Sequence, residues 1–393
     1  MRYFTGKIHE LPLTPILGYY ISILALLTLC GILVAALWPF HSPRNQVQWL
    51  GNENGLRFGR YGTVLSSGQF EVTGSDGPSC SIEIWLQPAL IWNRGTSLTF
   101  YNPLDRGQFS LQQNYTNLVL HRDVGDEYHQ TNLDVVEVFR KKQPLITVTS
   151  NGQDTSVYID GNLVKRSLRF GLSLNDLAGK LIAANSPLQG HSWSGQLRGL
   201  AIYQGELTAE QVARHYQDWT QKGKPAVAEN GRTLALYLFD EHTGKVIHNQ
   251  VRSGPDLYIP ERYLVVHQTL LEPPWREFQT QSGYLENALI NIAGFVPLGF
   301  FFGAYFTAVR PIKHAILVTI VFGALLSLVI EVTQAYLPTR DSGVTDVITN
   351  TLGTAVGVAL YCAVALPLLR ALAARDSRHW ASYFGIPSRP GSQ

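Results

Sequence analysis

The stretch Ile330–Asn350 decides the fold of this chain, and it reads IEVTQAYLPTRDSGVTDVITN. Glu331 stands inside one long apolar run, and Arg340, Asp341 and Asp346 separate that run from the next. Ionisable groups at membrane depth cost free energy, so they usually persist there for a functional reason. The stretch therefore predicts two membrane-spanning helices joined at a polar site.

Four apolar segments are long enough to span a membrane, because a hydrocarbon core of about 30 Å takes roughly 20 helical residues. They are residues 16–38, 288–309, 315–337 and 347–369. The first follows Arg2 and Lys7, as a signal peptide would, but its apolar run exceeds the ~7–15 residues of a signal sequence. We therefore interpret it as an uncleaved anchor and predict a membrane α-helical bundle of four transmembrane helices.

Basic residues near the ends of these segments predict the orientation of the chain. They are Arg2 and Lys7, then Arg310 and Lys313, then Arg370, Arg375 and Arg378. All three groups fall on one side of the membrane, and short loops rich in Lys and Arg stay in the cytoplasm. We therefore expect a multi-pass protein of the inner (cytoplasmic) membrane with both termini cytoplasmic. Residues 46–265 and the loop 338–345 are then extracytoplasmic.

The middle of the chain has a different pattern, with short alternating apolar runs broken by Gly, Asn and Asp. Alternation at period two with regular turn signals indicates an all-β sandwich or barrel. Within it, Asp160-Gly161 between two short runs predicts a hairpin turn. Thr208, with Gln211 three residues later, predicts the capping box of one short helix over 208–217.

Two segments of this region resemble LamG-type, concanavalin A-like sandwiches. One is residues 148–162, with the hairpin, and the other is 193–216, where a glycine-bearing strand precedes a short helix. Residues 234–244 resemble the strand that usually opens such domains, yet here they follow the closing helix. The resemblance implies a sandwich with a circularly shifted order, or one that this strand closes from the far end. Binding of envelope polysaccharide, peptidoglycan or protein is then expected, although a fold does not determine its ligand.

Catalysis and metal binding by the sandwich have weaker support. Related sandwiches that cleave glycosides carry paired carboxylates on one strand, but Glu83 has no such partner, so we interpret it as an outward polar residue. Asp154, Asp160 and Asp240 could supply oxygen ligands to calcium, while turn chemistry explains Asp160 equally well. Some aromatic residues could stack on sugars, although a core position is the simpler interpretation. They are Trp85, Trp92, Tyr101 and Trp193.

The composition limits which other classes of function can be expected. A net charge of +2 gives no electrostatic reason to expect nucleic acid as a partner. Cys30, Cys80 and Cys362 suggest no disulfide framework. The predicted domains are 1–45 with the first helix, 46–265 as the sandwich, 284–372 as a three-helix membrane region, and 373–393 as a cytoplasmic tail.

The membrane region resembles the VanZ-like family of small membrane proteins over residues 284–370. The matching motifs agree in order and spacing, and they are Asn291–Phe300, Ile330–Gln334, Arg340-Asp341 and Asp346–Gly357. The family takes its name from a protein linked to glycopeptide (teicoplanin) resistance, so the resemblance implies a role in the bacterial cell envelope. It leaves the biochemical activity open. The chain departs from the family at Asn287, where an acidic residue is common and here Glu286 is adjacent.

Spacing brings the polar residues of these motifs onto shared helix faces. Glu331 and Gln334 lie three apart on one helix, and Asp346 and Asn350 lie four apart at the start of the next, which Asp346 can also cap. Arg340 can pair with a carboxylate or hold an anion such as a lipid phosphate. The candidate polar membrane site is Asn291, Glu331, Gln334, Arg340, Asp341, Asp346 and Asn350. Close helix packing is predicted at Gly299 with Gly303 and at Gly353 with Gly357.

Several functions remain open for this polar site. Its residues can form a structural network that needs no ligand, or they can bind a lipid head group or a lipid-linked envelope precursor. An enzyme would use Glu331 or Asp346 as general acid or base and Arg340 to hold phosphate. A transporter has only Glu331 in its favour. Because these residues include no Ser/His pair, Cys nucleophile or metal-ligand set, we expect a binding protein without a cofactor.

Overall fold

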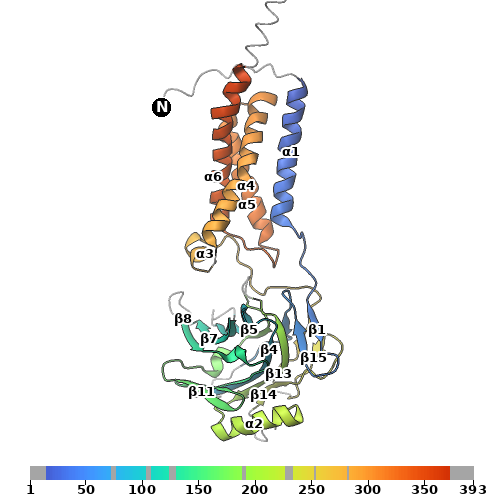
Figure 1. Ribbon diagram of the computed structural model, residues 1–393, viewed down its shortest axis with the longest axis vertical. Coiled ribbons are helices and arrows are strands. Elements are labelled where there is room, and N and C mark those ends of the chain that lie inside the picture. Colours follow the sequence, from blue (N-terminus) through green and yellow to red (C-terminus); the bar gives the residue numbers. More distant parts are fainter. Residues whose placement is uncertain are drawn as a thin grey trace, which may run out of the picture. The chain divides into compact units, whose positions relative to one another are not determined.

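The computed structural model describes residues 15–71, 77–102, 108–123, 130–187, 192–225, 233–251, 254–280 and 283–371. The chain forms two compact units, a helical bundle and a β-rich domain (Figure 1). One unit joins Met1–His41 to Thr269–Gln393, and the other is Ser42–Gln268. The β-rich domain is therefore an insertion in the chain of the bundle.

Four long apolar helices build the first unit, and each is long and apolar enough to cross a membrane. They are α1 (Pro15–Leu37), α4 (Tyr284–Ala304), α5 (Ala315–Gln334) and α6 (Val344–Leu360). The π-helical turns η3 (Tyr305–Val309) and η4 (Tyr361–Ala365) extend α4 and α6, and the short helix α3 (Pro274–Thr280) precedes α4. The predicted four-helix membrane fold is confirmed.

The end of α5 follows from its sequence. Beyond Gln334 the chain tightens, and the Leu337 N–H donates to the Gln334 carbonyl over 2.8 Å. Pro338 then disfavours helical geometry at the residue before it. The helix therefore stops in time for the polar residues at 340–346 to lie in the connection to α6 and in its first turn.

Small residues bring α4 and α6 together backbone to backbone. A Cβ placed on Gly357 would lie 2.0 Å from the Val296 carbonyl oxygen, and one on Gly353 would lie 2.3 Å from that of Ile292. A Cβ on Gly299 would meet the Thr354 carbonyl at 2.0 Å. Gly303 differs, because its Cβ would meet only side chains, the Tyr361 ring at 3.5 Å and Val358 Cγ2 at 3.7 Å. Only glycine permits the approach at the first three positions.

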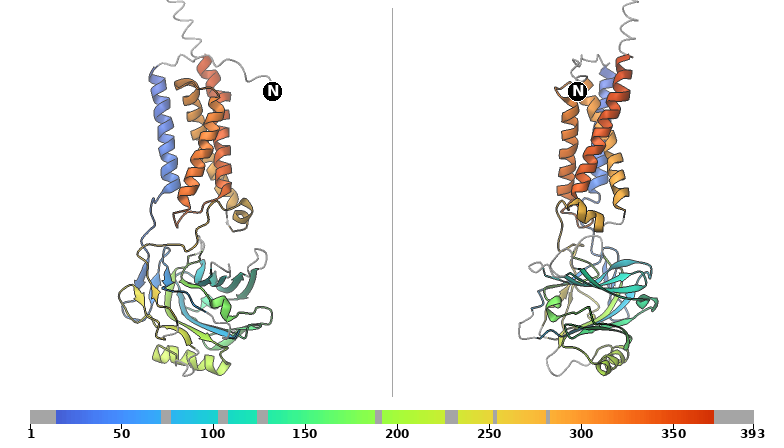
Figure 2. Two further views of the ribbon diagram at one scale, coloured as in Figure 1. Left: turned by 180° about the vertical axis from the view of Figure 1, so that it is seen from behind. Right: turned by 90° about the vertical axis from the view of Figure 1, so that its left-hand side faces the viewer.

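The second unit is a sandwich of two antiparallel sheets, seen from two sides in Figure 2. The first sheet runs β1 (Val47–Trp49), β2 (Leu56–Phe58), β13 (Gly195–Gln204), β4 (Cys80–Pro88), β9 (Leu145–Ser150), β10 (Thr155–Ile159) and β11 (Asn162–Ser167), with β14 (Thr233–Tyr237) also on β13. The second runs β15 (Val246–Ile247), β16 (Leu257–Tyr258), β3 (Val64–Ser66), β12 (Lys180–Ala183), β5 (Arg94–Tyr101), β6 (Gln108–Asn114), β7 (Asn117–Asp123) and β8 (Gln130–Val135).

Local signals in the sequence position the hairpin and the helix of this domain. Asp160 and Gly161 have φ angles of 53° and 78° between β10 and β11, the left-handed pair that a tight hairpin needs. Helix α2 (Ala209–Lys222) begins at a reciprocal capping box of Thr208 and Gln211. Both predictions are confirmed, and the helix runs a turn further than expected. The 3₁₀ turns η1 (Val138–Arg140) and η2 (Leu174–Leu177) lie in connections.

The strand that follows the closing helix joins the first sheet. β14 pairs antiparallel with the second half of β13, with Tyr237 opposite Leu200. β2 pairs with the first half of β13, through Gly195–Leu197. Two short strands thus share one edge of β13, and of the strand expected within residues 234–244 only the part up to Tyr237 forms, as β14.

Glu83 occupies the outward face of its strand, as the alternation predicts, but it is buried. Its side chain does point away from the sandwich core, but α2 covers that face of the sheet and leaves the residue 0 % exposed. The carboxylate accepts hydrogen bonds from the Tyr203 hydroxyl (2.9 Å) and Trp219 Nε1 (3.0 Å). His215 Nδ1 lies 3.0 Å from its other oxygen. A buried carboxylate persists here because these groups pair with it.

Candidate functional site

The polar residues of the membrane region meet at one end of the helical bundle. The Gly343 N–H, at the start of α6, donates to Glu331 Oε2 on α5 over 2.9 Å. Asn291 Nδ2, near the start of α4, donates to Asp346 Oδ1 over 2.7 Å. Gln334 Nε2 donates to the Ala36 carbonyl, in the last turn of α1, over 2.9 Å. All four long helices therefore contribute to this end of the bundle.

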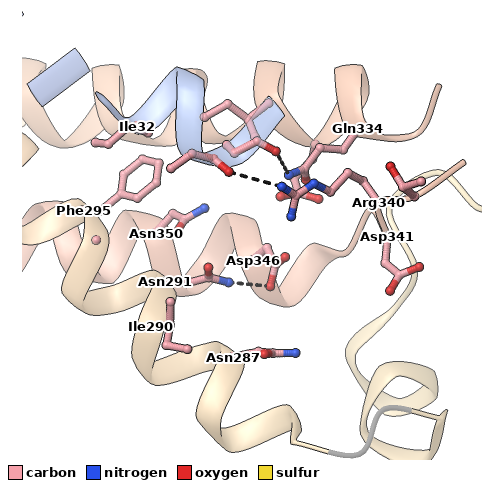
Figure 3. A pocket seen from close by; sticks show the side chains of 16 residues that line it. Ile32, Asn287, Ile290, Asn291, Phe295, Gln334, Arg340, Asp341, Asp346 and Asn350 are labelled. Carbon is pink, nitrogen blue, oxygen red and sulfur yellow. Dashed lines mark hydrogen bonds between the residues drawn. The ribbon is translucent and has the colours of Figure 1, made fainter. Parts of the chain in front are cut away.

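A cavity of about 420 Å³ opens among these side chains (Figure 3). Its polar lining is Asn287, Asn291, Glu331, Gln334, Thr339, Arg340, Asp341, Asp346 and Asn350. Its apolar lining is Ile32, Ala35, Ala36, Ile290, Gly294, Phe295 and Ile330. The cavity thus has one polar and one apolar part, and all seven residues of the candidate polar site line it.

Two amide oxygens at this cavity are buried without a partner. Asn350 is 4 % exposed and donates through Nδ2 to Ser327 Oγ over 2.9 Å, which leaves its Oδ1 unpaired. Gln334 is 8 % exposed, and its Oε1 likewise accepts no bond from the described residues. Buried polar atoms are nearly always hydrogen-bonded in native proteins. These two oxygens are therefore positioned to accept hydrogen bonds from a bound molecule.

Arg340 contacts backbone carbonyls, whereas the sequence suggested a carboxylate or an anion. Its Nη2 donates to the carbonyl of Trp38 over 2.5 Å and to that of Ala35 over 3.3 Å. These carbonyls lie at the C-terminal end of α1, where helical oxygens lack intrahelical donors. Arg340 therefore caps α1, and its charge also suits the negative end of the helix dipole.

Asp346 does not cap α6. The helix begins at Gly343, whose extended backbone precedes Val344, and Asp346 lies in the first turn. From there its carboxylate faces the cavity and holds Asn291. An acidic group in the first turn is still favoured by the helix dipole.

No local pattern in the sequence pointed to Glu277, which lies in α3 and is 3 % exposed. A Cβ built on Gly343 would lie 1.5 Å from Glu277 Oε1, so this glycine makes room for the carboxyl. Burial raises the pKa of Glu277, and the nearby Asp341 adds to the rise. Burial also raises the pKa of Glu272, with Glu277 and Asp341 contributing. The carboxyl groups of Glu272, Glu277 and Asp341 thus lie close enough to one another to interact.

The aromatic residues of the sandwich separate into buried and exposed ones. Trp193 is fully buried, Trp85 packs against Trp219, and Tyr101 is half-buried. Trp92 is 69 % exposed in the connection between β4 and β5. Tyr115, which the sequence reading did not select, is 43 % exposed in the neighbouring turn.

Trp92 and Tyr115 belong to one exposed surface at an end of the sandwich, which we call the aromatic rim. Its members are Leu90, Ile91, Trp92, Arg94 and Tyr115. The Arg94 guanidinium lies 4.6 Å from the centroid of the Tyr115 ring. Below the rim, buried Gln113 donates to the carbonyls of Leu90 (2.9 Å) and Tyr115 (3.1 Å). The rim is therefore held by a buried side chain.

Two of the three proposed calcium ligands, Asp154 and Asp160, have protein partners, and the third, Asp240, is exposed. Asp154 pairs with Arg166 Nη2 at 3.1 Å. Asp160 pairs with Lys141 Nζ at 2.7 Å and accepts from the Leu145 N–H. In the part of the chain that the structure describes, no three His, Cys, Asp or Glu side chains are grouped so as to hold a metal ion.

Family comparisons agree with both units of the fold. Residues 236–366 match the VanZ/LLP1 family, and residues 58–213 match Laminin_G_3, of the concanavalin A-like lectin/glucanases superfamily. The protein is therefore a multi-pass membrane protein with a VanZ/LLP1 region and a concanavalin A-like domain. None of the curated protein sequences matches the chain.

Three solved structures illustrate what the chain is similar to. The binding domain of Paraclostridial Mosquitocidal Protein 1 is 14 % identical with a TM-score of 0.33, and the match covers 46 % of this chain and 47 % of that one. A SAP-like pentraxin from Limulus polyphemus is 12 % identical with a TM-score of 0.33, over 58 % and 96 %. A protein from Bacteroides ovatus is 13 % identical with a TM-score of 0.37, over 53 % and 58 %. The chain thus spans about half the length of the first.

Proposed function

We propose that this protein is a binding protein of the bacterial cell envelope, whose bundle holds the head group of a lipid or lipid-linked precursor while its sandwich binds an envelope glycan. The observation that carries the proposal is the pair of buried, unpartnered amide oxygens at the cavity, Gln334 Oε1 and Asn350 Oδ1. An unpaired buried polar group costs about 1–3 kcal/mol. Two of them around one cavity favour a ligand over a purely structural network.

The apolar part of the cavity supports a lipid as the ligand. Ile32 from α1, Ile290 and Phe295 from α4, and Ile330 from α5 line it within the membrane-spanning helices. The polar residues line the same cavity at the end of the bundle. A molecule with a polar head and an acyl chain matches both halves, and pockets of this size are common for small ligands.

The connections to the sandwich support an extracytoplasmic site. α1 ends and α4 begins at the cavity end of the bundle, since Ala36 and Asn291 both bond to residues of the cavity lining. Both chain segments that lead to the sandwich therefore leave from this end. With the positive-inside rule, we assign this end and residues 46–265 to the outside of the cytoplasmic membrane. Residues 284–372 form the membrane region, and 373–393 a cytoplasmic tail.

The aromatic rim is our candidate for the glycan site of the sandwich. Sugars stack their apolar faces on exposed aromatic rings, and Trp92 and Tyr115 offer two such rings close to the charge of Arg94. The Tyr115 N–H donates to the Asn93 carbonyl over 2.8 Å, which joins the two turns. Support from Gln113 keeps the rings in position before a ligand arrives, which lowers the entropy lost on binding.

The alternative of an enzyme on a lipid-linked substrate has less support. Glu331 is 1 % exposed and holds the Gly343 N–H, so its carboxylate is engaged in joining α5 to α6. Asp346 lines the cavity and is the better candidate for acid–base chemistry. A link to glycopeptide (teicoplanin) resistance would be a consequence of envelope binding.

Lipid retention by the purified full chain tests the proposal. We expect native mass spectrometry to find a bound lipid that is lost in the cavity variant Asn350→Leu. The matched control is Thr333→Val, since Thr333 is an exposed residue of α5 outside the cavity lining, and its hydroxyl donates to the carbonyl of Val329 in the same helix. Equal retention by both variants would contradict a ligand site at this cavity.

A further inference from the structure

The cavity offers hydrogen-bond acceptors from its amide side chains. Gln334 Nε2 donates to the Ala36 carbonyl, and a carbonyl oxygen can only accept, so this contact determines which end of the amide is nitrogen. Its Oε1 remains for the cavity. Asn291 is oriented in the same way, because its Nδ2 donates to the carboxylate of Asp346.

Asn350 adds a second free acceptor. Its nitrogen donates to Ser327 Oγ on α5, and its Oδ1 is buried without a partner among the described residues. Of the four amides in the lining, the nitrogens of Asn291, Gln334 and Asn350 therefore bond to the protein. What a ligand meets from Gln334 and Asn350 is oxygen.

The charged groups of the lining are also mostly hydrogen-bond acceptors. Three carboxyl groups line the cavity, from Glu331, Asp341 and Asp346, against the one guanidinium of Arg340. Arg340 already donates to the carbonyls of α1. A negatively charged ligand group would meet three carboxyl groups against one guanidinium, whose Nη2 is already bonded to α1, whereas a positively charged donor would be attracted by the carboxyl groups.

We propose that the cavity recognises a primary ammonium group, carried by the head group of a lipid. An ammonium group has three N–H donors and no acceptor. Gln334 Oε1, Asn350 Oδ1 and the Asp346 carboxylate supply three acceptors around one cavity, and the carboxylate also neutralises the charge. This inference rests on the proposed function, because the lipid character of the ligand comes from the apolar lining.

Competition among lipids tests the inference with the full chain in detergent. The chain is mixed with equal amounts of phosphatidylethanolamine, phosphatidylcholine and phosphatidylglycerol of matched acyl chains, and bound lipid is counted by native mass spectrometry. We expect the ethanolamine lipid to bind about tenfold more tightly than either competitor, since one lost charge-assisted hydrogen bond changes affinity by roughly that factor. Phosphatidylcholine keeps the charge but has no N–H donor, so it separates hydrogen bonding from charge.

Two variants locate the selectivity. Gln334→Met removes an acceptor at nearly constant volume, and Asp346→Asn removes the charge. Both should lower the preference for the ethanolamine lipid about tenfold, while Thr333→Val keeps it. A separate thermal-unfolding measurement checks that the variants are folded, because Gln334 also contacts α1.

The outcomes distinguish this inference from the proposed function. If phosphatidylglycerol binds as well as the ethanolamine lipid, the ammonium inference fails and a lipid site stands. If no lipid is retained, the lipid proposal fails, and free ethanolamine then becomes the probe. A rise in unfolding temperature with ethanolamine but not with ethylene glycol supports an ammonium site for a soluble ligand. No rise with either overturns both.

Discussion

Gly343 leaves the space that the carboxyl group of Glu277 occupies, since a Cβ at position 343 would lie 1.5 Å from Glu277 Oε1. The same glycine donates its N–H to Glu331. Next to it, the Glu272 N–H donates to the Ser342 carbonyl over 2.8 Å, and the Val344 N–H donates to the Glu272 carbonyl over 2.9 Å. Backbone hydrogen bonds of Glu272 thus join the segment before α3 to the start of α6, and Gly343 leaves room for Glu277 of α3.

The stability of this junction should depend on pH. Burial raises the pKa of Glu277 and of Glu272 above 4.5, so the folded protein holds these protons more tightly than the unfolded chain does. Stability should therefore fall as the pH rises from about 4.5 through the raised pKa values. Glu277→Gln should flatten this dependence in thermal-unfolding curves of the full chain between pH 4 and pH 8. An unchanged slope in the variant would contradict the assignment.

Backbone contact between α4 and α6 should tolerate no side chain at Gly357. Gly357→Ala would bring a methyl group 2.0 Å from the Val296 carbonyl oxygen, so the helices must separate. We expect a loss of about 1–3 kcal/mol, typical of overpacking, and a lower unfolding temperature. Gly303→Ala is the matched control, because its methyl group would meet the Tyr361 ring at 3.5 Å. Similar losses in both variants would count against this packing.

Removing the buried carboxylate under α2 should loosen that helix. Glu83→Leu leaves the Tyr203 hydroxyl and the indole N–H of Trp219 buried without their acceptor. Each unpaired group costs about 1–3 kcal/mol. Tryptophan fluorescence and near-ultraviolet circular dichroism would report the change around Trp219. Glu206→Gln, at an exposed position just before α2, should leave both signals unaltered.

Glycan binding should depend on the aromatic rim. Loss of one stacking ring costs about 1–3 kcal/mol if aromatic stacking on sugars resembles that on bases, so Trp92→Ala should weaken binding of the full chain to an envelope-glycan panel about tenfold or more. Tyr115→Ala should have a smaller effect in the same direction. Trp275→Ala is the control, since Trp275 is also highly exposed but belongs to the membrane unit. Equal binding by all three variants would remove the rim as the glycan site.

Reporter fusions should establish the orientation in the membrane. A reporter joined after Trp38 should be exported, because the basic residues before α1 hold its start in the cytoplasm. One joined after Arg310 should stay cytoplasmic. Alkaline phosphatase and fluorescent-protein activities in cells give the two readings, and the opposite pattern would invert the assigned topology.

The elements of this fold were readable from the sequence because their signals are local. Long apolar runs give the four long helices, Asp160-Gly161 gives a hairpin, and Thr208 with Gln211 gives a helix start. The burial of Glu83 could not be read from a local signal. Alternation shows which face of a strand a residue occupies, but whether a helix covers that face depends on distant parts of the chain.

The candidate site shows the same division. Its residues could be selected because polar groups among apolar runs are conspicuous, and they do line one cavity. Their partners could not be predicted: Arg340 binds carbonyls of α1, which is distant in sequence, and Glu277 enters from a separate short helix. The unpaired oxygens of Gln334 and Asn350 become visible only once every neighbour is known.

The hydrogen bonds that Gln334 and Arg340 donate to the C-terminal end of α1 have a mechanical consequence. Only Trp38–His41 separate that turn from the first residue of the sandwich unit. If the sandwich binds the cell envelope as proposed, tension on it would be transmitted through these four residues into α1. It would first load the hydrogen bonds at Ala35, Ala36 and Trp38, which two residues of the cavity lining make. The polypeptide itself thus couples a pull on the sandwich to the shape of the cavity.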